Sequence, residues 1–198
     1  MQTFEQFSDV SVLGSNLQAI VDGFGTFSIL GNRILLDEGL GNEGRDGSIN
    51  FQKDQWYPLA TFLRAFDRIG KEFGGYMQRQ VGLSIPKNAL FPPTVVDIDS
   101  AIQAIDVAYH MNHAINGVPL FSPATGRKTD RIGNYGYERQ PGKKLIVSRC
   151  TTPYPCTFDE GILTSMAQRF DRTSSVTHVP GACRSRGSSH CIYHIAWK

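Results

Sequence analysis

The segment Cys183–Cys191, CRSRGSSHC, decides the fold of the C-terminal part of the chain. Gly187 stands at its centre and apolar segments flank it, so the sequence predicts a β-hairpin that holds the two cysteines face to face. Opposed residues of antiparallel strands have Cβ atoms about 4.5–5.5 Å apart. That separation fits zinc held by thiolates and nearly fits a disulfide, so the hairpin alone does not decide between them.

A third cysteine, Cys156, stands directly before the segment TFDEGILTSMAQRF, which has the pattern of a helix. Thr157 followed by Glu160 predicts a capping box at its start. The free amides and the dipole of a helix N-terminus favour a thiolate at Cys156. We therefore expect three sulfur ligands for one metal ion.

A tetrahedral metal needs one further ligand, and His178 and Cys150 are the candidates for that place. His190 and His194 are poorer candidates, because strand alternation points them away from the Cys191 side of the hairpin. The alternatives without a metal are ordinary buried thiols or a disulfide. The predicted zinc ligands are Cys156, Cys183 and Cys191, with His178 or Cys150 as the fourth.

The composition restricts the class of protein. Its 198 residues carry 20 basic and 18 acidic side chains, a net charge of +2, which gives no reason to expect nucleic acid or an anionic membrane as partner. We find no run of about 18 apolar residues, so we expect no membrane span. The first ten residues lack the pattern of a secretory signal, which favours the cytoplasm, where thiols stay reduced.

The apolar spacing predicts helices at about 14–25, 54–73, 75–85, 97–115 and 156–170. Pro58 is placed in the first turn of the second of these, and Asp99 or Ser100 at the cap of the fourth. Strands are expected at 135–138, 144–150, 174–179 and 191–197. The fold class is therefore α+β, with helices packed on an antiparallel sheet. We expect residues 1–50 to form an N-terminal layer and residues 51–198 the main domain.

A ligand pocket is expected between the helices at 54–73 and 97–115. Such a pocket needs an apolar wall with a few polar groups, whereas the simpler interpretation places the same side chains in the core. Heme ligation by His110 or His113 is an alternative, although no Cys-x-x-Cys-His attachment motif is present. The expected pocket residues are Trp56, Phe62, Phe66, Tyr109, His110 and His113.

The segments YPCTFDEGILTSMAQRF and HVPGACRSRGSSHCIYHIAW resemble the C-terminal half of the 4-vinyl-reductase-like (4VR) sensory domains. These occur in XylR-type phenol-sensing activators and in regulatory proteins associated with heme-NO-binding domains. The resemblance covers about residues 50–198. It implies the α+β ligand-binding fold of NO-signalling and Golgi-transport proteins, with zinc on Cys156, Cys183 and Cys191. The acidic fourth ligand of these domains has no counterpart, because Pro180 stands at its place and His178 is the substitute.

Together these features predict a non-enzymatic sensory or regulatory domain that binds a small hydrophobic or aromatic molecule and contains a structural zinc. Such a domain would act through a signalling partner or as a homodimer. The alternatives are an enzyme or accessory protein acting on a tetrapyrrole, a heme-binding protein, and a tethering subunit with an acyl chain in its core. No glycine-rich phosphate loop or nucleophile elbow favours an enzyme.

Overall fold

The computed structural model describes residues 4–87 and 89–198, and it has the α+β fold class that the sequence predicts. The α-helices are α1 (Ser15–Gly23), α2 (Ser28–Asp37), α3 (Leu59–Ser84), α4 (Ile98–Met111) and α5 (Cys156–Gln168). Short 3-10 helices are η1 (Glu5–Phe7), η2 (Gly25–Phe27), η3 (Ile85–Lys87) and η4 (Arg184–Arg186).

The strands form two four-stranded antiparallel sheets and one two-stranded ribbon, where the sequence suggested a single sheet. The first sheet, in the order β4-β1-β5-β6, contains Trp56–Pro58, Val10–Leu13, His113–Ile115 and Val118–Pro119. The second, in the order β7-β8-β10-β9, contains Glu138–Arg139, Leu145–Cys150, Cys191–Ala196 and Ser175–His178. The ribbon joins β2 (Asn42–Glu43) to β3 (Ile49–Asn50).

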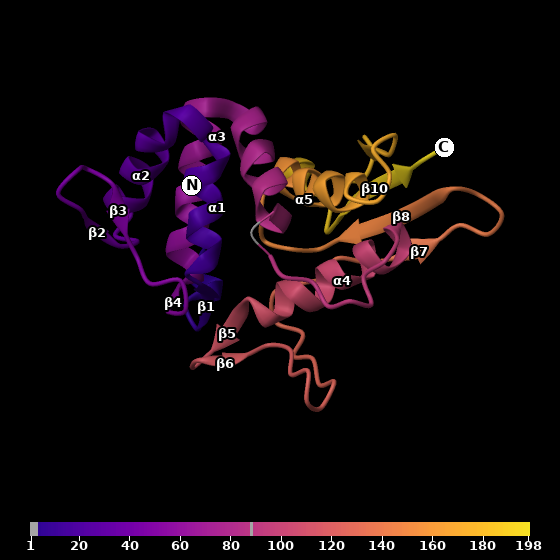
Figure 1. Cartoon of the computed structure of the whole chain (residues 1–198), viewed down its shortest axis with the longest axis horizontal. Coiled ribbons are helices and arrows are strands. Elements are labelled where there is room, and N and C mark those ends of the chain that lie inside the picture. Colours follow the sequence, from indigo (N-terminus) through magenta and orange to yellow (C-terminus); the bar gives the residue numbers. More distant parts are fainter. Residues whose placement is uncertain (1–3, 88) are drawn as a thin grey trace.

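Helices α3 and α5 pack against each other and so connect the N-terminal helices with the second sheet. Figure 1 shows α1 and α2 beside α3 at one end, and the second sheet with α5 at the other. Strand β1, from the first fifty residues, pairs with both β4 and β5. The N-terminal segment is therefore hydrogen-bonded into the same sheet as later parts of the chain.

Helix α3 contains a sharp break, and it crosses α5 at very close range. Gly74 has φ 76° and ψ 175°, a conformation favourable only to glycine, so the two helices expected at 54–73 and 75–85 are two arms around this residue. A Cβ atom at Gly82 would lie 2.2 Å from the carbonyl oxygen of Phe158, and one at Gly161 would lie 2.4 Å from that of Arg79. These two glycines therefore allow the backbones of α3 and α5 to touch.

Three of the expected helix boundaries are wrong. Trp56 lies in β4, where it pairs with Leu13, and α3 begins only at Leu59. The apolar spacing around Trp56 resembles that of a helix, but the backbone hydrogen bonds of this segment are made with β1 instead. Helix α4 is capped by Asp97, whose side chain accepts from the Ser100 amide at 2.8 Å, rather than by Asp99 or Ser100. This helix ends at Met111, so His113 lies in β5 and does not share a helical face with Tyr109.

The predicted start of α5 and the predicted terminal hairpin also need correction. The N-cap of α5 is Pro155, and Thr157 makes no capping bond because its hydroxyl donates to Gln78 Oε1 at 2.8 Å. Strand β10 pairs with β9 through Tyr193 and His178, and Cys191 stands opposite Cys150 of β8. Cys183 is thus not opposite Cys191 in a ladder. It lies in the long loop between β9 and β10.

Within the described residues, no individual helix has both the length and the apolar character needed to cross a membrane. Two consecutive helical segments, Ser15–Gly23 and Gly25–Asp37, reach that length and apolar character only when taken together, and they are bent by 108° relative to each other.

Candidate functional site

Four candidate metal ligands converge at one end of the second sheet. Cys191 begins β10, His178 ends β9, and Cys156 is the first residue of α5. Cys183 directly precedes η4 in the loop between β9 and β10. One ligand atom of each residue lies within 4.8 Å of those of the other three. The structure therefore brings together the same four side chains that the sequence predicted, which we call the cysteine cluster.

The sulfurs of the cysteine cluster lie close together, and the separation between Cys156 and Cys183 matches that around a tetrahedral zinc ion. The Sγ atoms of Cys156 and Cys183 are 3.8 Å apart, and those of Cys156 and Cys191 are 3.1 Å apart. Tetrahedral zinc with bonds of about 2.3 Å separates two sulfurs by about 3.8 Å. A disulfide requires about 2.05 Å, and all four cysteines of the chain are free thiols.

The environment of the cysteine cluster affects its three thiols unequally. Burial raises the pKa of Cys183, but hydrogen bonds from Ser185, Cys156 and backbone amides outweigh it, so that pKa is lowered. Burial raises the pKa of Cys191 to about 11, although the Arg184 amide donates to its Sγ at 3.3 Å. Because zinc binds thiolates, metal binding here would release protons and strengthen as the pH rises.

His178 and Cys150, the two candidates for the fourth ligand, lie in different surroundings. The His178 ring stacks on Tyr193 at a centroid distance of 4.7 Å, and its Nε2 is 3.1 Å from the carbonyl oxygen of Ala182. An imidazole that donates one N–H to a backbone carbonyl is oriented to offer its other nitrogen to a metal. Cys150 is buried with its Sγ 3.6 Å from Ser148 Oγ, and it is not a member of the cysteine cluster.

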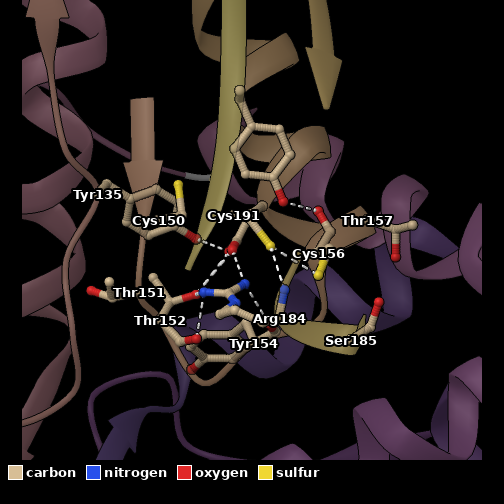
Figure 2. Close-up of polar contacts among 12 residues, drawn as sticks. Tyr135, Cys150, Thr151, Thr152, Tyr154, Cys156, Thr157, Arg184, Ser185 and Cys191 are labelled. Atoms are coloured by element: carbon tan, nitrogen blue, oxygen red, sulfur yellow. Dashed lines mark hydrogen bonds and ion pairs between the residues drawn. The ribbon is translucent and has the colours of Figure 1, made fainter. Parts of the chain in front are cut away.

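A buried ion pair between Arg184 and Asp159 adjoins the cysteine cluster, because Arg184 directly follows Cys183. Figure 2 shows Arg184 beside Cys156 and Cys191. Asp159 is fully buried, and its Oδ2 lies 2.5 Å from Nη2 of Arg184. The guanidinium also donates to Thr152 Oγ1 and to the Tyr154 carbonyl, each at 2.9 Å. Asp159 accepts a further hydrogen bond from the Tyr135 hydroxyl at 2.6 Å. Burial raises the pKa of Asp159, and Arg184 and the hydrogen bonds oppose that rise.

A cavity of about 330 Å³ is lined mainly by α1, α4 and α5, and α3 contributes only Phe62 to it, so it does not lie simply between the two long helices as expected. Its wall is mainly apolar, and the lining contains no Lys, Arg, Asp or Glu among the residues that the structure describes. The aromatic lining residues and the histidine are Phe62, Tyr109, His113, Tyr135, Tyr154 and Phe158. Ser15, Asn16 and Asn112 add polar groups at another part of the wall.

The polar groups of the aromatic wall are paired with one another or with the backbone. Nδ1 of His113 is 2.7 Å from the Tyr109 carbonyl, so this nitrogen carries the proton and Nε2 accepts from the Tyr154 hydroxyl at 2.7 Å. The Tyr109 hydroxyl donates to the carbonyl of Ile132 at 2.7 Å, and that of Tyr135 donates to Asp159. Each of the three tyrosine protons is therefore already donated within the protein.

Burial keeps the histidine and the tyrosines of this wall uncharged. It lowers the pKa of His113 from 6.5 to about 4. It raises the pKa of Tyr109, Tyr135 and Tyr154 well above 10. Near neutral pH the wall consequently presents neutral imidazole and phenol groups to any ligand.

The fold of the chain can be compared with those of known proteins. The sequence matches no protein-family model and no curated protein. An H-NOX protein from S. oneidensis in the Fe(II) ligation state, a triple mutant, superimposes with a TM-score of 0.64 at 15% identity, over 94% of this chain and 96% of that one. The chain has the H-NOX fold.

Two other H-NOX structures show the same likeness. A single-site variant of Tt H-NOX has a TM-score of 0.60 at 12% identity, with 94% of this chain and 95% of that chain covered. The Fe(II) unliganded H-NOX protein from K. algicida has a TM-score of 0.56 at 9% identity, with coverage of 94% and 96%. At such identities the likeness establishes the fold. The resemblance to 4-vinyl-reductase-like domains stays a prediction.

Three of the six expected pocket residues line the cavity, namely Phe62, Tyr109 and His113. Phe66 is packed behind the wall, with its ring 5.6 Å from that of Tyr154. Trp56 lies in β4, outside the lining. His110 is buried outside it too: its Nδ1 is 2.8 Å from the Asp106 carbonyl, and its Nε2 has no hydrogen-bond partner among the described residues.

Sequence reasoning missed Tyr135, Tyr154, Asp159 and Arg184. Tyr154 lies outside the regular strands and helices, where no periodicity marks a buried side chain, and Tyr135 was expected in a strand at 135–138, whereas β7 begins only at Glu138. Asp159 carried a usable signal, because Ile162 and Leu163 follow it at three- and four-residue spacing and so share its buried helix face. A carboxylate on an apolar face needs a cationic partner, and Arg184 beside Cys183 was available.

Proposed function

We propose that this chain is a small-molecule sensory domain, in which the cavity lined by α1, α4 and α5 binds a neutral apolar or aromatic molecule. The observation that carries the proposal is the uncharged, mainly apolar cavity with His113 and Tyr154 at its wall. Its volume of about 330 Å³ is at the small end of the range for ligand pockets. The sequence resemblance to phenol-sensing activators supports the same class of ligand. Ligand occupancy would be passed to a signalling partner or to a second copy of the chain.

The hydrogen bonds of the wall restrict the ligand further. Tyr109, Tyr135 and Tyr154 have each donated their hydroxyl proton to a protein acceptor. Their oxygens can therefore only accept from a ligand. A bound molecule should be neutral, because no charged lining group would pair with an ion, and it should carry one O–H or N–H donor.

We further propose that the cysteine cluster binds zinc and that this zinc is structural. Four protein ligands close a tetrahedral shell and leave no position for a substrate. The cluster joins the β9–β10 loop to the start of α5, which are distant in the sequence. Metal bound there would therefore hold the C-terminal loop against the body of the domain.

Heme is a second candidate for the cavity, favoured by His113 and by the fold. Because Nδ1 donates to the Tyr109 carbonyl, Nε2 is the unprotonated nitrogen, which is the kind of atom that binds a heme iron. In this structure the Tyr154 hydroxyl occupies Nε2, and the described lining has no Lys or Arg to pair with heme propionates. A strong visible absorbance band in the purified protein would select heme over an organic ligand.

Titration with three naphthalene probes tests the proposed ligand class. We expect 2-naphthol, a neutral donor, to bind with a measurable change in its fluorescence. The ether 2-methoxynaphthalene lacks the donor and should bind about tenfold more weakly, as expected for the loss of one neutral hydrogen bond. The anion 2-naphthoate should not bind, because its charge would be buried without a partner.

Variants of α4 show whether the probe occupies this cavity. Ala108 lines it, so Ala108→Leu should fill space and weaken 2-naphthol binding. Val107→Leu is the matched control, since Val107 is partly exposed and lies outside the lining. Equal affinities for the three probes, or equal effects of the two leucine variants, would contradict the proposal.

A further inference from the structure

Arg184 connects the cysteine cluster to the core of the protein. Its backbone N–H donates to Cys191 Sγ at 3.3 Å, and it follows Cys183 directly in the chain. Its side chain points the other way and is 14% exposed, while that of its partner Asp159 is 0% exposed. One residue therefore belongs to the metal-binding loop through its backbone and to the buried network through its guanidinium.

The same guanidinium supports two tyrosines of the cavity wall. It donates to the Tyr154 carbonyl at 2.9 Å, and the Tyr154 hydroxyl reaches His113. Through Asp159 it is also connected to Tyr135, whose hydroxyl donates to that carboxylate at 2.6 Å. Figure 2 shows the Arg184 side chain next to Tyr154, with Tyr135 and the sulfurs of Cys156 and Cys191 around the same network. Along this route each contact between side chains or backbone groups is a direct hydrogen bond or an ion pair.

Arg184 cannot move away from Asp159 without a large cost in free energy, because an isolated carboxylate is very unfavourable in the interior. If the β9–β10 loop lost its metal and moved, Arg184 would leave Asp159 without its cationic partner. The hydrogen bonds of Asp159 with Tyr135 and of Arg184 with the Tyr154 backbone would then have to rearrange. The shape and polarity of the cavity wall would change with them.

We propose that Arg184 and Asp159 are positioning residues that couple metal binding at the cysteine cluster to ligand binding in the cavity. The inference rests on the proposed function, since it assigns regulation to the same cavity. Binding linkage is reciprocal, so a ligand in the cavity raises the affinity for zinc by the factor by which zinc raises the affinity for the ligand.

The coupling factor is measured on the full chain with zinc and 2-naphthol. In the wild type, removing zinc with a chelator should weaken 2-naphthol binding at least fivefold, the lower end of typical allosteric coupling. Saturating 2-naphthol should raise the zinc affinity, measured against a chromogenic chelator, by the same factor. A factor of one in the wild type would overturn the coupling and leave the proposed function intact.

Variants of the pair show whether it carries the coupling. The double variant Arg184→Met with Asp159→Asn leaves no buried unpaired charge and should reduce the factor to about one. Arg184→Lys keeps the charge but lacks the planar fork, so it should also reduce the factor, and it provides the test if the double variant does not fold. The control is Arg186→Met, because Arg186 is exposed in the same loop and should keep the wild-type factor. An unchanged factor in the Arg184 variants would overturn the proposal.

A second readout does not need a ligand. His113 accepts from Tyr154, so its imidazole ¹⁵N resonances report the state of the cavity wall. They should shift when zinc is removed from the wild type and should not shift in the double variant. If 2-naphthol fails to bind, the proposed function fails on that ligand class, and the histidine resonances still decide the coupling. If the His113 resonances of the wild type do not change when zinc is removed, the proposed coupling is overturned.

Discussion

Arg184→Ala should lower the free energy of unfolding of the zinc-loaded protein by about 3–5 kcal/mol, the usual cost of removing one partner of a buried ion pair. The reason is that Asp159 is fully buried, so its carboxylate would remain in the interior without the cation that Arg184 supplies. Replacing both residues, Arg184→Met with Asp159→Asn, should cost much less, because no isolated charge remains. Urea denaturation monitored by circular dichroism measures both.

An exposed ion pair provides the control for this prediction. Lys71 and Asp67 are 2.5 Å apart, closely similar to the buried pair, but the Lys71 side chain is 61% exposed. Exposed pairs of this kind contribute about 0–1 kcal/mol, so Lys71→Ala should have a small effect. If Arg184→Ala and Lys71→Ala destabilise the protein equally, the buried network does not have the role that we assign to it.

Acid should destabilise the protein through His113, by about 3 kcal/mol between pH 6.5 and pH 4. The pKa of His113 is lowered from 6.5 to about 4, mainly by burial. Between these values the unfolded chain binds a proton that the folded protein does not, so stability is present above pH 6.5 and is lost as the pH falls. A difference of about 2.5 pH units corresponds to about 3 kcal/mol.

The histidine contribution is isolated by comparing variants across the same pH range. His113→Gln should remove this part of the acid sensitivity while other titrating groups keep theirs. His194→Gln is the control, because His194 is exposed on β10 and should leave the pH dependence as in the wild type. If His113→Gln loses stability in acid as steeply as the wild type, His113 is not the neutral buried group described above.

The fold class and the members of the cysteine cluster could be predicted from the sequence, but the geometry that assembles the cluster could not. Residue types and their position beside helix α5 indicated a metal site on Cys156, Cys183 and Cys191. The loop with η4 that carries Cys183 depends on contacts with distant residues, and a symmetric hairpin was the simpler local solution. Trp56 was misplaced for a similar reason, because pairing with β1 overrides its helix-like spacing.

The cavity was only partly predictable. Phe62 and Tyr109 lie on helices, where periodicity marks the buried face. Tyr135 and Tyr154 lie in connecting segments, and they face the cavity because Asp159, Arg184 and His113 bind their polar atoms. Such long-range pairing leaves no regular spacing in the sequence.

The central claim, that three sulfurs and one imidazole converge on zinc, is tested most directly by the X-ray absorption fine structure of the zinc-loaded protein. The account predicts three sulfur neighbours at about 2.3 Å and one nitrogen at about 2.0–2.1 Å, with one sulfur lost in Cys183→Ser. A shell of four sulfurs would assign the fourth place to Cys150. A shell of oxygen and nitrogen alone, or no bound zinc, would contradict the account.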